Sequence, residues 1–299
     1  MDTTAPHDLT LFLHLAESLH FARSAKALHM SPSALTRAIQ RMEEDLGHPL
    51  FQRDKRRVVL TRAGEIFRDH ARAQVAAHAR LREALAGEAE APTGELRIAC
   101  TVTACLSVLP KLFARCRDRY PGIHLQLSTS DAARCMQALE SDEVDLAVVP
   151  EPERPAAEFR FVRLAHTDLA FIAPASDPEL VRRARLGGKE WNGLPTILPR
   201  RGLERQRIDA WLEQQGARPE IYAEVDGNEA ILAMVALGCG VGVVPELVRK
   251  DSPLRGRIEQ VEVKRPPRGY HVSLCAKSRT LERRTAAALW ELAPTTALG

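Results

Sequence analysis

The hydrophobic pattern of this chain changes once, near residue 90, and this change constrains the fold more than any other feature. Before it, apolar residues recur at the three- and four-residue spacing of helices, as at Leu9, Phe12 and Ala16. After Leu96, short apolar runs typical of buried strands alternate with helical segments. The stretch 89–94 (Ala-Glu-Ala-Pro-Thr-Gly) lies between them and predicts a hinge. We therefore expect an all-α N-terminal part followed by an α/β part.

Length and composition agree with a soluble protein of about two domains. The chain has 299 residues, of which 45% are hydrophobic and 27% charged. It contains no apolar run of the ~18 to 20 residues that a membrane helix needs. Its N-terminus has no basic segment followed by an apolar core, so we expect no export and a cytoplasmic location.

The cysteines give no sign of a metal centre or a disulfide framework. They contain no Cys-x-x-Cys pair and no neighbouring group of histidines, and they stand at Cys100, Cys105, Cys116, Cys135, Cys239 and Cys275. We expect reduced, mostly buried thiols, and neither a metal nor a cofactor.

Residues 22–41 have the pattern of a helix-turn-helix. A short helix over 22–28 is followed by Ser31, which suits a helix N-cap, and Pro32, which suits the first helical position. Gly47 is expected to end this second helix. Its inward residues are predicted to be Leu35, Ile39, Met42 and Leu46, and its outward ones Ser33, Thr36, Arg37, Gln40 and Arg41. Short polar and basic side chains on an exposed helix are suited to reading base edges in a major groove, although an ordinary helical hairpin would share the pattern.

Positive charge gathers in two nearby stretches. Residues 21–42 contain four basic residues and no acidic one, and residues 50–62 contain five basic residues against Asp54. Together they would form a face suited to phosphates, whereas each alone would be an ordinary solvated surface.

A hairpin and a long helix are predicted to follow. Residues 58–60, with the preceding basic run, could form a short hairpin arm, and Thr61 can cap a helix extending to about residue 88. A weak heptad stripe runs along this helix through Phe67, Ala71, Gln74, His78, Leu81 and Leu85. The stripe fits either a dimer seam or a monomeric surface helix.

In the α/β part, polar residues follow several predicted strands. Strands are expected at 96–100, 124–127, 145–149, 169–173, 195–198 and 221–225, with helices at 132–139, 204–214 and 228–236, in parallel α/β units. Residues after the strands could hold a small anion through hydroxyl, amide, guanidinium or backbone N–H groups, and they are Thr101, Val102, Thr103, Ser128, Thr129, Ser130, Arg200, Arg201 and Asn228. Plain N-capping explains any one of them, but their convergence at strand ends favours a site.

The N-terminal motifs together resemble the DNA-binding domain of LysR-type transcriptional regulators. The residues that carry the resemblance are Phe12-Leu13-His14-Leu15-Ala16-Glu17-Ser18, Arg23-Ser24-Ala25, the run from Leu28 to Arg37, Glu43-Glu44-Asp45-Leu46-Gly47, Leu50-Phe51-Gln52-Arg53 and the run from Leu60 to Glu65. Two later stretches look like landmarks of the same family, namely 94–98 and 236–242.

The resemblance implies a winged helix-turn-helix over 1–61, a linker and dimerisation helix with a hinge over 62–92, and an effector-binding domain over 93–299. That domain would have a periplasmic-binding-protein-like fold of two lobes, lobe I over 93–164 and 270–299 and lobe II over 165–269. The chain would cross between lobes near residues 163–165 and return near 268–271. Double-stranded DNA, a second copy of the chain in a dimer or tetramer, and RNA polymerase would be its partners.

The residues expected at DNA are Phe21, Arg23, Ser31, Pro32, Ser33, Thr36, Arg37, Gln40, Arg41, Arg53, Arg56 and Arg57. Within the family, residues 31–36, 101–104, 131–133 and 234–241 are most similar to activators of the acetohydroxy acid isomeroreductase gene of branched-chain amino acid synthesis. This similarity implies acetolactate or acetohydroxybutyrate as the effector, held without a metal.

Two other functions compete with a regulator. The chain could be a metabolite-binding protein whose helical N-terminus only mediates assembly. It could also be a thiol enzyme that pairs Cys100 with His166 or Cys239 with His271, but no nucleophile elbow, phosphate loop or His-Glu-x-x-His motif occurs. We therefore expect no enzymatic activity.

Overall fold

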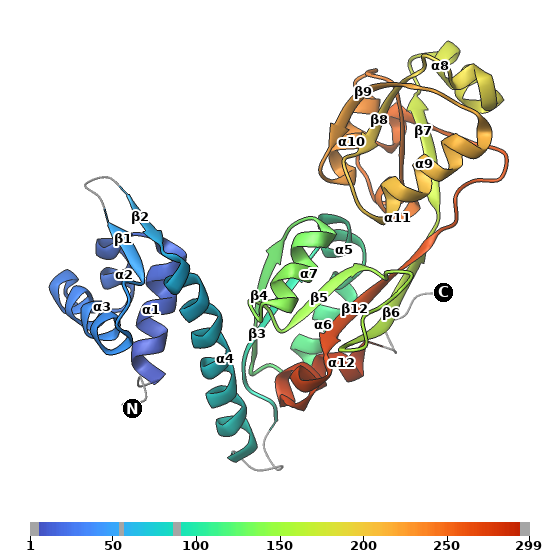
Figure 1. Ribbon diagram of the computed structural model, residues 1–299. Coiled ribbons are helices and arrows are strands. Elements are labelled where there is room, and N and C mark those ends of the chain that lie inside the picture. The colour runs from blue at the N-terminus through green and yellow to red at the C-terminus, as the bar shows by residue number, and fades with distance from the viewer. Residues whose placement is uncertain (1–5, 54–56, 86–90, 294–299) are drawn as a thin grey trace. The chain divides into compact units, whose positions relative to one another are not determined.

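The computed structural model describes residues 6–53, 57–85 and 91–293 (Figure 1). The chain divides into two compact units near residue 90. The elements of the N-terminal unit are α1 (Pro6–Ser18), α2 (Phe21–Ala27), α3 (Pro32–Leu46), β1 (Phe51–Arg53), β2 (Val58–Leu60) and α4 (Arg62–Leu85). The predicted change from an all-helical pattern, with one hairpin, to alternating strands and helices is confirmed.

The helix-turn-helix forms as its local residues predict. Ser31 Oγ accepts the backbone N–H of Ala34 at 3.2 Å, and Pro32 opens α3. Gly47 ends the helix in the left-handed region with φ of +70°. In the turn before it, His29 also has a positive φ, +54°, which is uncommon for a residue with a Cβ.

The core of the N-terminal unit is aromatic and aliphatic. The Phe12 ring packs edge-on against Phe67 of α4, with ring centroids 4.7 Å apart, and lies tilted against Phe51 of the hairpin, with centroids 5.3 Å apart. Leu35, Ile39 and Met42 are buried as predicted, but Leu46 is 41% exposed. The prediction for Leu46 was wrong because it stands on the last turn of α3, where few neighbouring elements cover the helix.

The hairpin and long helix also follow the prediction. Strand β1 pairs with β2 in antiparallel register, Phe51 opposite Leu60. Thr61 Oγ1 accepts the N–H of Gly64 at 3.0 Å and so caps α4. Residues 86–88, which the predicted helix included, lie outside the described residues, as do residues 89–90 of the predicted hinge.

The second unit contains two lobes. Lobe I comprises β3 (Gly94–Cys100), α5 (Val102–Ser107), α6 (Leu109–Arg119), β4 (Ile123–Thr129), α7 (Ala132–Glu140), β5 (Leu146–Pro150), β6 (Phe159–Thr167), β12 (Tyr270–Lys277) and α12 (Arg284–Leu292). Lobe II comprises β7 (Leu169–Pro174), α8 (Pro178–Leu186), β8 (Pro195–Pro199), α9 (Leu203–Gln215), β9 (Glu220–Val225), α10 (Asn228–Ala236), β10 (Val241–Pro245), α11 (Glu246–Lys250) and β11 (Ile258–Val261).

Each lobe has its own five-stranded sheet within the described residues. The strand order is β4-β3-β5-β12-β6 in lobe I and β11-β7-β10-β8-β9 in lobe II. Strands β3, β4 and β5 are parallel, as are β8, β9 and β10, which fits the predicted α/β units. Each sheet also contains antiparallel strands, because β12 runs antiparallel to β5 and β6, and β7 runs antiparallel to β10 and β11.

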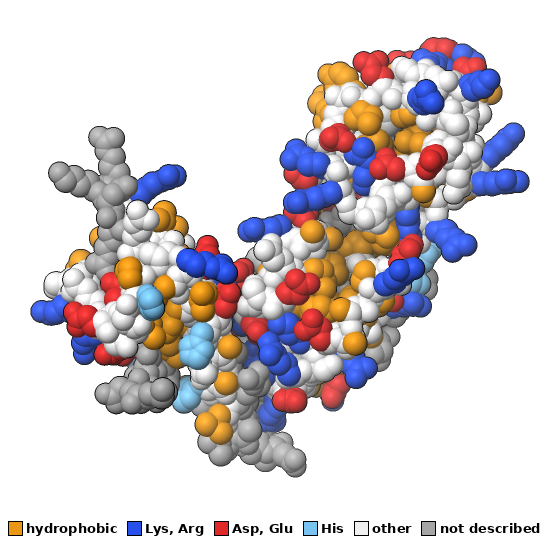
Figure 2. Space-filling view, in the orientation of Figure 1, with side chains coloured by type: hydrophobic (Ala, Val, Ile, Leu, Met, Phe, Trp, Pro, Cys, Tyr) orange, Lys and Arg blue, Asp and Glu red, His pale blue; other side chains and the backbone are white. Residues whose placement is uncertain are grey.

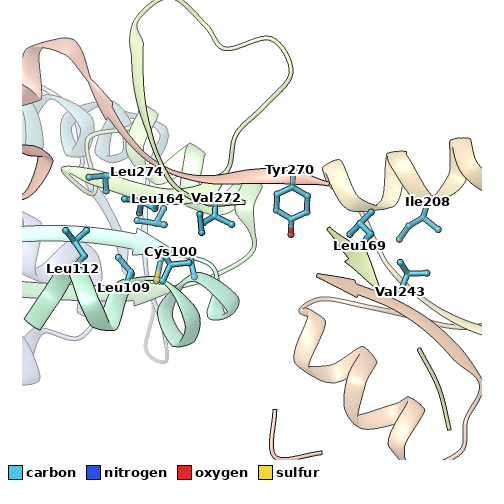
Figure 3. Packing of buried hydrophobic residues seen from close by; sticks show 14 of the residues in the cluster. Cys100, Leu109, Leu112, Leu164, Leu169, Ile208, Val243, Tyr270, Val272 and Leu274 are labelled. Atoms are coloured by element: carbon cyan, nitrogen blue, oxygen red, sulfur yellow. The ribbon is translucent and has the colours of Figure 1, made fainter. Parts of the chain in front are cut away.

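The two lobes are joined by a pair of antiparallel strands, β6 and β12 (Figure 1). Strand β6 remains in the lobe I sheet through Thr167, which pairs with Tyr270. The chain therefore enters lobe II at Asp168, a few residues later than the expected crossing near 163–165. It returns at Tyr270, whose side chain is 4% exposed and stands between apolar residues of the two lobes (Figure 3).

None of the helices in the described part of the chain is long and apolar enough to span a membrane. On the visible face of the two-lobed unit, acidic and basic side chains are interspersed (Figure 2).

Candidate functional site

The first candidate site is the outward face of α3. Ser33, Arg37, Gln40 and Arg41 are exposed on it, as predicted. Thr36 is half-buried, and its hydroxyl donates to the carbonyl of Pro32 at 2.9 Å, so this hydroxyl is already engaged with the helix backbone. Ser31 and Pro32 are exposed at the start of the helix. A row of hydrogen-bonding and cationic side chains on one exposed helix face is suited to base edges and phosphates.

The other residues predicted at DNA fall into three groups. Arg23 and Arg57 are exposed, and the Arg23 guanidinium donates to the carbonyl of Ser18. Phe21 is half-buried, and its ring centroid lies 6.3 Å from that of Phe51, so it packs α2 against the hairpin. Arg53 is the last residue of β1, and Arg56 lies outside the described residues.

The second candidate site is a cavity of about 420 Å³ between the lobes of the second unit. It is lined where helices begin. Lobe I contributes Thr101, Val102 and Thr103 at the start of α5 and residues 130–133 at the start of α7. Lobe II contributes residues 199–204 before and within α9 and residues 225–229 before and within α10.

Most of the predicted binding residues do line this cavity. They are Thr101, Val102, Thr103, Ser130, Arg200, Arg201 and Asn228. Ser128 and Thr129 do not line it, so the structure does not bring them together with the others. They are the last residues of β4, which forms the edge of the lobe I sheet, so the chain has not yet turned towards the cavity there.

The threonines have distinct roles in the local structure. Thr101 Oγ1 accepts the N–H of Ala104 at 3.2 Å and caps α5, which leaves its O–H free to donate elsewhere. The hydroxyl of the buried Thr103 donates to Glu229 Oε1 at 3.1 Å, across the gap between the lobes. Capping and ligand binding are therefore compatible at Thr101.

Both arginines of the cavity already have acidic partners. Arg201 Nη2 lies 2.9 Å from Asp131 Oδ2, and Arg200 Nη1 lies 3.4 Å from Asp226 Oδ2. Both guanidinium groups are 59% exposed, so these pairs are weakly held. An incoming carboxylate would compete with Asp131 or Asp226 for them.

Two acidic residues of the cavity, Glu204 and Glu229, were missed by the sequence reasoning. Each stands in the first turn of a helix, where an acid is ordinarily explained by the helix dipole. Glu204 Oε1 accepts from Tyr270 Oη and, at 3.2 Å, from Asn228 Nδ2. Burial, reinforced by the nearby charge of Glu229, raises the pKa of the Glu204 carboxyl above its usual range. No sequence signal would have found this cluster, because Glu204 and Tyr270 are far apart in the chain.

Cys100, one of the two thiols considered as a nucleophile, is buried. Burial raises the pKa of Cys100 to about 12, so its thiol is protonated at neutral pH. Among the described residues, no three histidine, cysteine or acidic side chains are grouped to hold a metal ion.

Comparison with known proteins identifies one family for both parts of the chain. Residues 6–65 match the bacterial regulatory helix-turn-helix of the LysR family, and residues 89–297 match the LysR substrate-binding domain. The chain is 40% identical over 290 residues to the transcriptional activator IlvY of Salmonella typhimurium, covering 96% of this chain and 98% of the relative. It is equally similar to the transcriptional regulator IlvY of Escherichia coli K12.

Solved structures show the same fold. A full-length OxyR from Pseudomonas aeruginosa superposes with a TM-score of 0.72 at 22% identity, covering 99% of this chain and all of that one. The LysR-family regulator CbnR superposes with a TM-score of 0.68 at 22% identity, with the same coverage. With two family models that together match most of its length, this chain belongs to the LysR family of transcriptional regulators and is similar to the activator IlvY.

Proposed function

We propose that this regulator activates a gene of branched-chain amino acid synthesis, the acetohydroxy acid isomeroreductase gene, in response to acetolactate or acetohydroxybutyrate. The similarity to IlvY along 96% of the chain is the observation that carries the proposal. We further propose that it acts in the cytoplasm as a dimer or tetramer, reads double-stranded DNA with α3 and contacts RNA polymerase.

The cavity between the lobes supports a small hydroxy-keto acid as the effector. A carboxylate would lie near the starts of α5 and α7, where the hydroxyls of Thr101 and Ser130 line the cavity and can donate to it. Arg200 or Arg201 would add a charged donor after exchanging its acidic partner. Ligand binding would then favour one closure of the lobes, because Arg201–Asp131 and Thr103–Glu229 span them.

A gel shift tests the proposal directly. The full chain is expected to retard a fragment from upstream of the isomeroreductase gene in preference to an unrelated fragment of equal length. Binding should weaken steeply as salt rises, because phosphate contacts release counterions. Equal binding to both fragments would contradict the assigned target.

Two arginine variants separate base reading from phosphate binding. Arg37 is exposed on α3, so Arg37→Ala should cost ~1 to 3 kcal/mol on the target site and relax the preference at one base pair. Arg57 is exposed beside the hairpin, so Arg57→Ala should weaken all sequences alike and lower the salt slope by about one. Fluorescence anisotropy on target and mismatched duplexes measures both effects. An equal loss of specificity in the two variants would mean that α3 is not the reading helix.

The Thr101 hydroxyl is tested by a matched pair of variants. Thr101→Val keeps the shape but removes the hydroxyl, and should weaken acetolactate binding by ~1 to 3 kcal/mol because a ligand oxygen loses its donor. Thr101→Ser keeps both the hydroxyl and the cap of α5, and should bind nearly as the parent does. Calorimetry on the full chain compares them. Parent-like binding by Thr101→Val would remove this residue from the site.

A further inference from the structure

One carboxyl group that lines the cavity keeps an oxygen atom available to accept a further hydrogen bond. Glu204, in the first turn of α9, lines the cavity and is half-buried. Both of its hydrogen bonds, from Tyr270 and Asn228, go to the same oxygen, Oε1. Within the described residues, no hydrogen bond or ion pair reaches Oε2 and no cation pairs with the carboxyl group.

The surroundings fix Glu204 in place. Tyr270 is buried at the start of β12, where the chain returns to lobe I, and its hydroxyl holds Oε1. Asn228, at the start of α10, holds the same atom. One oxygen is thus anchored by donors from two other elements, and the second is left for a ligand in the cavity. This oxygen can accept a further hydrogen bond, so a ligand that donates to it gains affinity.

We propose that Glu204 Oε2 recognises the hydroxyl group of the effector and so distinguishes a hydroxy-keto acid from a keto acid that lacks the hydroxyl. This inference rests on the proposed effector class and names the residue that selects within it. A hydroxyl suits this oxygen in either protonation state, because it donates to the carboxylate and accepts from the carboxylic acid. A ligand without the hydroxyl presents no donor to the carboxylate.

Because the Glu204 carboxyl group can be neutral or charged, its selectivity for the hydroxy-keto acid should depend on pH. The groups that face Glu204 are Glu229 of α10, Tyr270 of β12 and Asn228, and Arg207 of α9 lies close to Tyr270. The charged groups elsewhere in the cavity are Asp131, Arg200, Arg201 and Asp226. Burial raises the pKa of Glu204, so the neutral form persists to a higher pH than for an exposed glutamate. Below that pKa, Oε2–H can donate to a ketone. Above it, only a ligand with a donor satisfies the oxygen, so the preference for the hydroxy acid rises with pH.

The test is calorimetry on the full chain with acetolactate and with 2-methylacetoacetate, which differs only by replacement of the hydroxyl with hydrogen. The ratio of their dissociation constants is measured over the whole pH range in which circular dichroism shows the protein folded. We expect the preference for acetolactate to increase roughly tenfold across this range, the worth of one hydrogen bond to a charged group.

Three variants assign the effect to Glu204. Glu204→Gln keeps the shape but does not titrate, so its ratio should be independent of pH. Tyr270→Phe removes a donor to the carboxylate, which should move the change in ratio to higher pH. Glu229→Gln removes a neighbouring negative charge and should move the change in ratio to lower pH. The last two variants keep the assignment testable if Glu204→Gln does not fold.

The outcomes are distinct. A pH-independent ratio in the parent protein, or the same pH dependence in Glu204→Gln as in the parent, would overturn the role of Glu204 alone. If neither compound binds at any pH, the proposed effector class is overturned, and this inference with it.

Discussion

Leu81→Asp is expected to convert the protein to monomers and to weaken its binding to a two-fold symmetric target by about 100-fold or more. Leu81 lies on the long helix α4 and is 54% exposed in the single chain, and the apolar Ile66 on the same helix is 60% exposed. These side chains would be covered in a dimer, as the resemblance to the family implies. A monomer grips one half-site only, so it loses the gain from binding both half-sites at once.

The measurement is sedimentation velocity together with anisotropy on the target duplex. Because Leu81 is exposed, its replacement opens no cavity, and the helix content seen by circular dichroism should stay that of the parent. Leu81→Met keeps an apolar side chain and serves as the matched control, which should remain dimeric. Unchanged sedimentation of Leu81→Asp would show that this part of α4 does not form the dimer interface.

Asp145→Ala is expected to lower the free energy of unfolding of lobe I by ~3 to 5 kcal/mol. Asp145 is 4% exposed and accepts from the Arg97 backbone N–H at 2.8 Å, from the Arg97 guanidinium at 3.0 Å and from the buried Arg283. The alanine variant would leave the Arg283 guanidinium buried without this carboxylate, and the backbone N–H of Arg97 in β3 would lose its side-chain acceptor.

Urea unfolding followed by tryptophan fluorescence checks this loss, since Trp290 lies on α12 close to Arg283 in sequence. Asp118→Ala is the matched control, because Asp118 is 71% exposed in its ion pair with Arg117 and should contribute less than about 1 kcal/mol. Similar losses in the two variants would mean that burial does not set the strength of the Asp145 network.

Local signals in the sequence predicted the N-terminal unit closely. The Ser31 cap, Pro32 and Gly47 determine where α3 begins and ends, and these are interactions between near neighbours in the chain. The exposed face of α3 follows from the same periodicity. Leu46 was misplaced because periodicity continues to the end of a helix, whereas burial there depends on which other elements reach it.

Long-range pairing explains what the sequence did not predict in the second unit. Strand β12 returns to lobe I after the whole of lobe II, and nothing near Tyr270 indicates that it pairs with Thr167. The same return brings Tyr270 to Glu204, so the acidic side of the cavity was missed as well. The threonines were found because residues after parallel strands gather at one sheet edge, which is a general rule. The same rule included Ser128 and Thr129, although they still belong to strand β4.

A hydroxy-keto acid in the cavity is expected to change the activity of the DNA-bound protein. Transcription in vitro from the isomeroreductase promoter, with RNA polymerase, the full chain and increasing acetolactate, measures this change. The amount of transcript should rise with acetolactate in the parent protein, and Thr101→Val should need at least roughly tenfold more acetolactate for the same rise. Transcription that stays constant while calorimetry shows acetolactate bound would contradict a role of the ligand in activation.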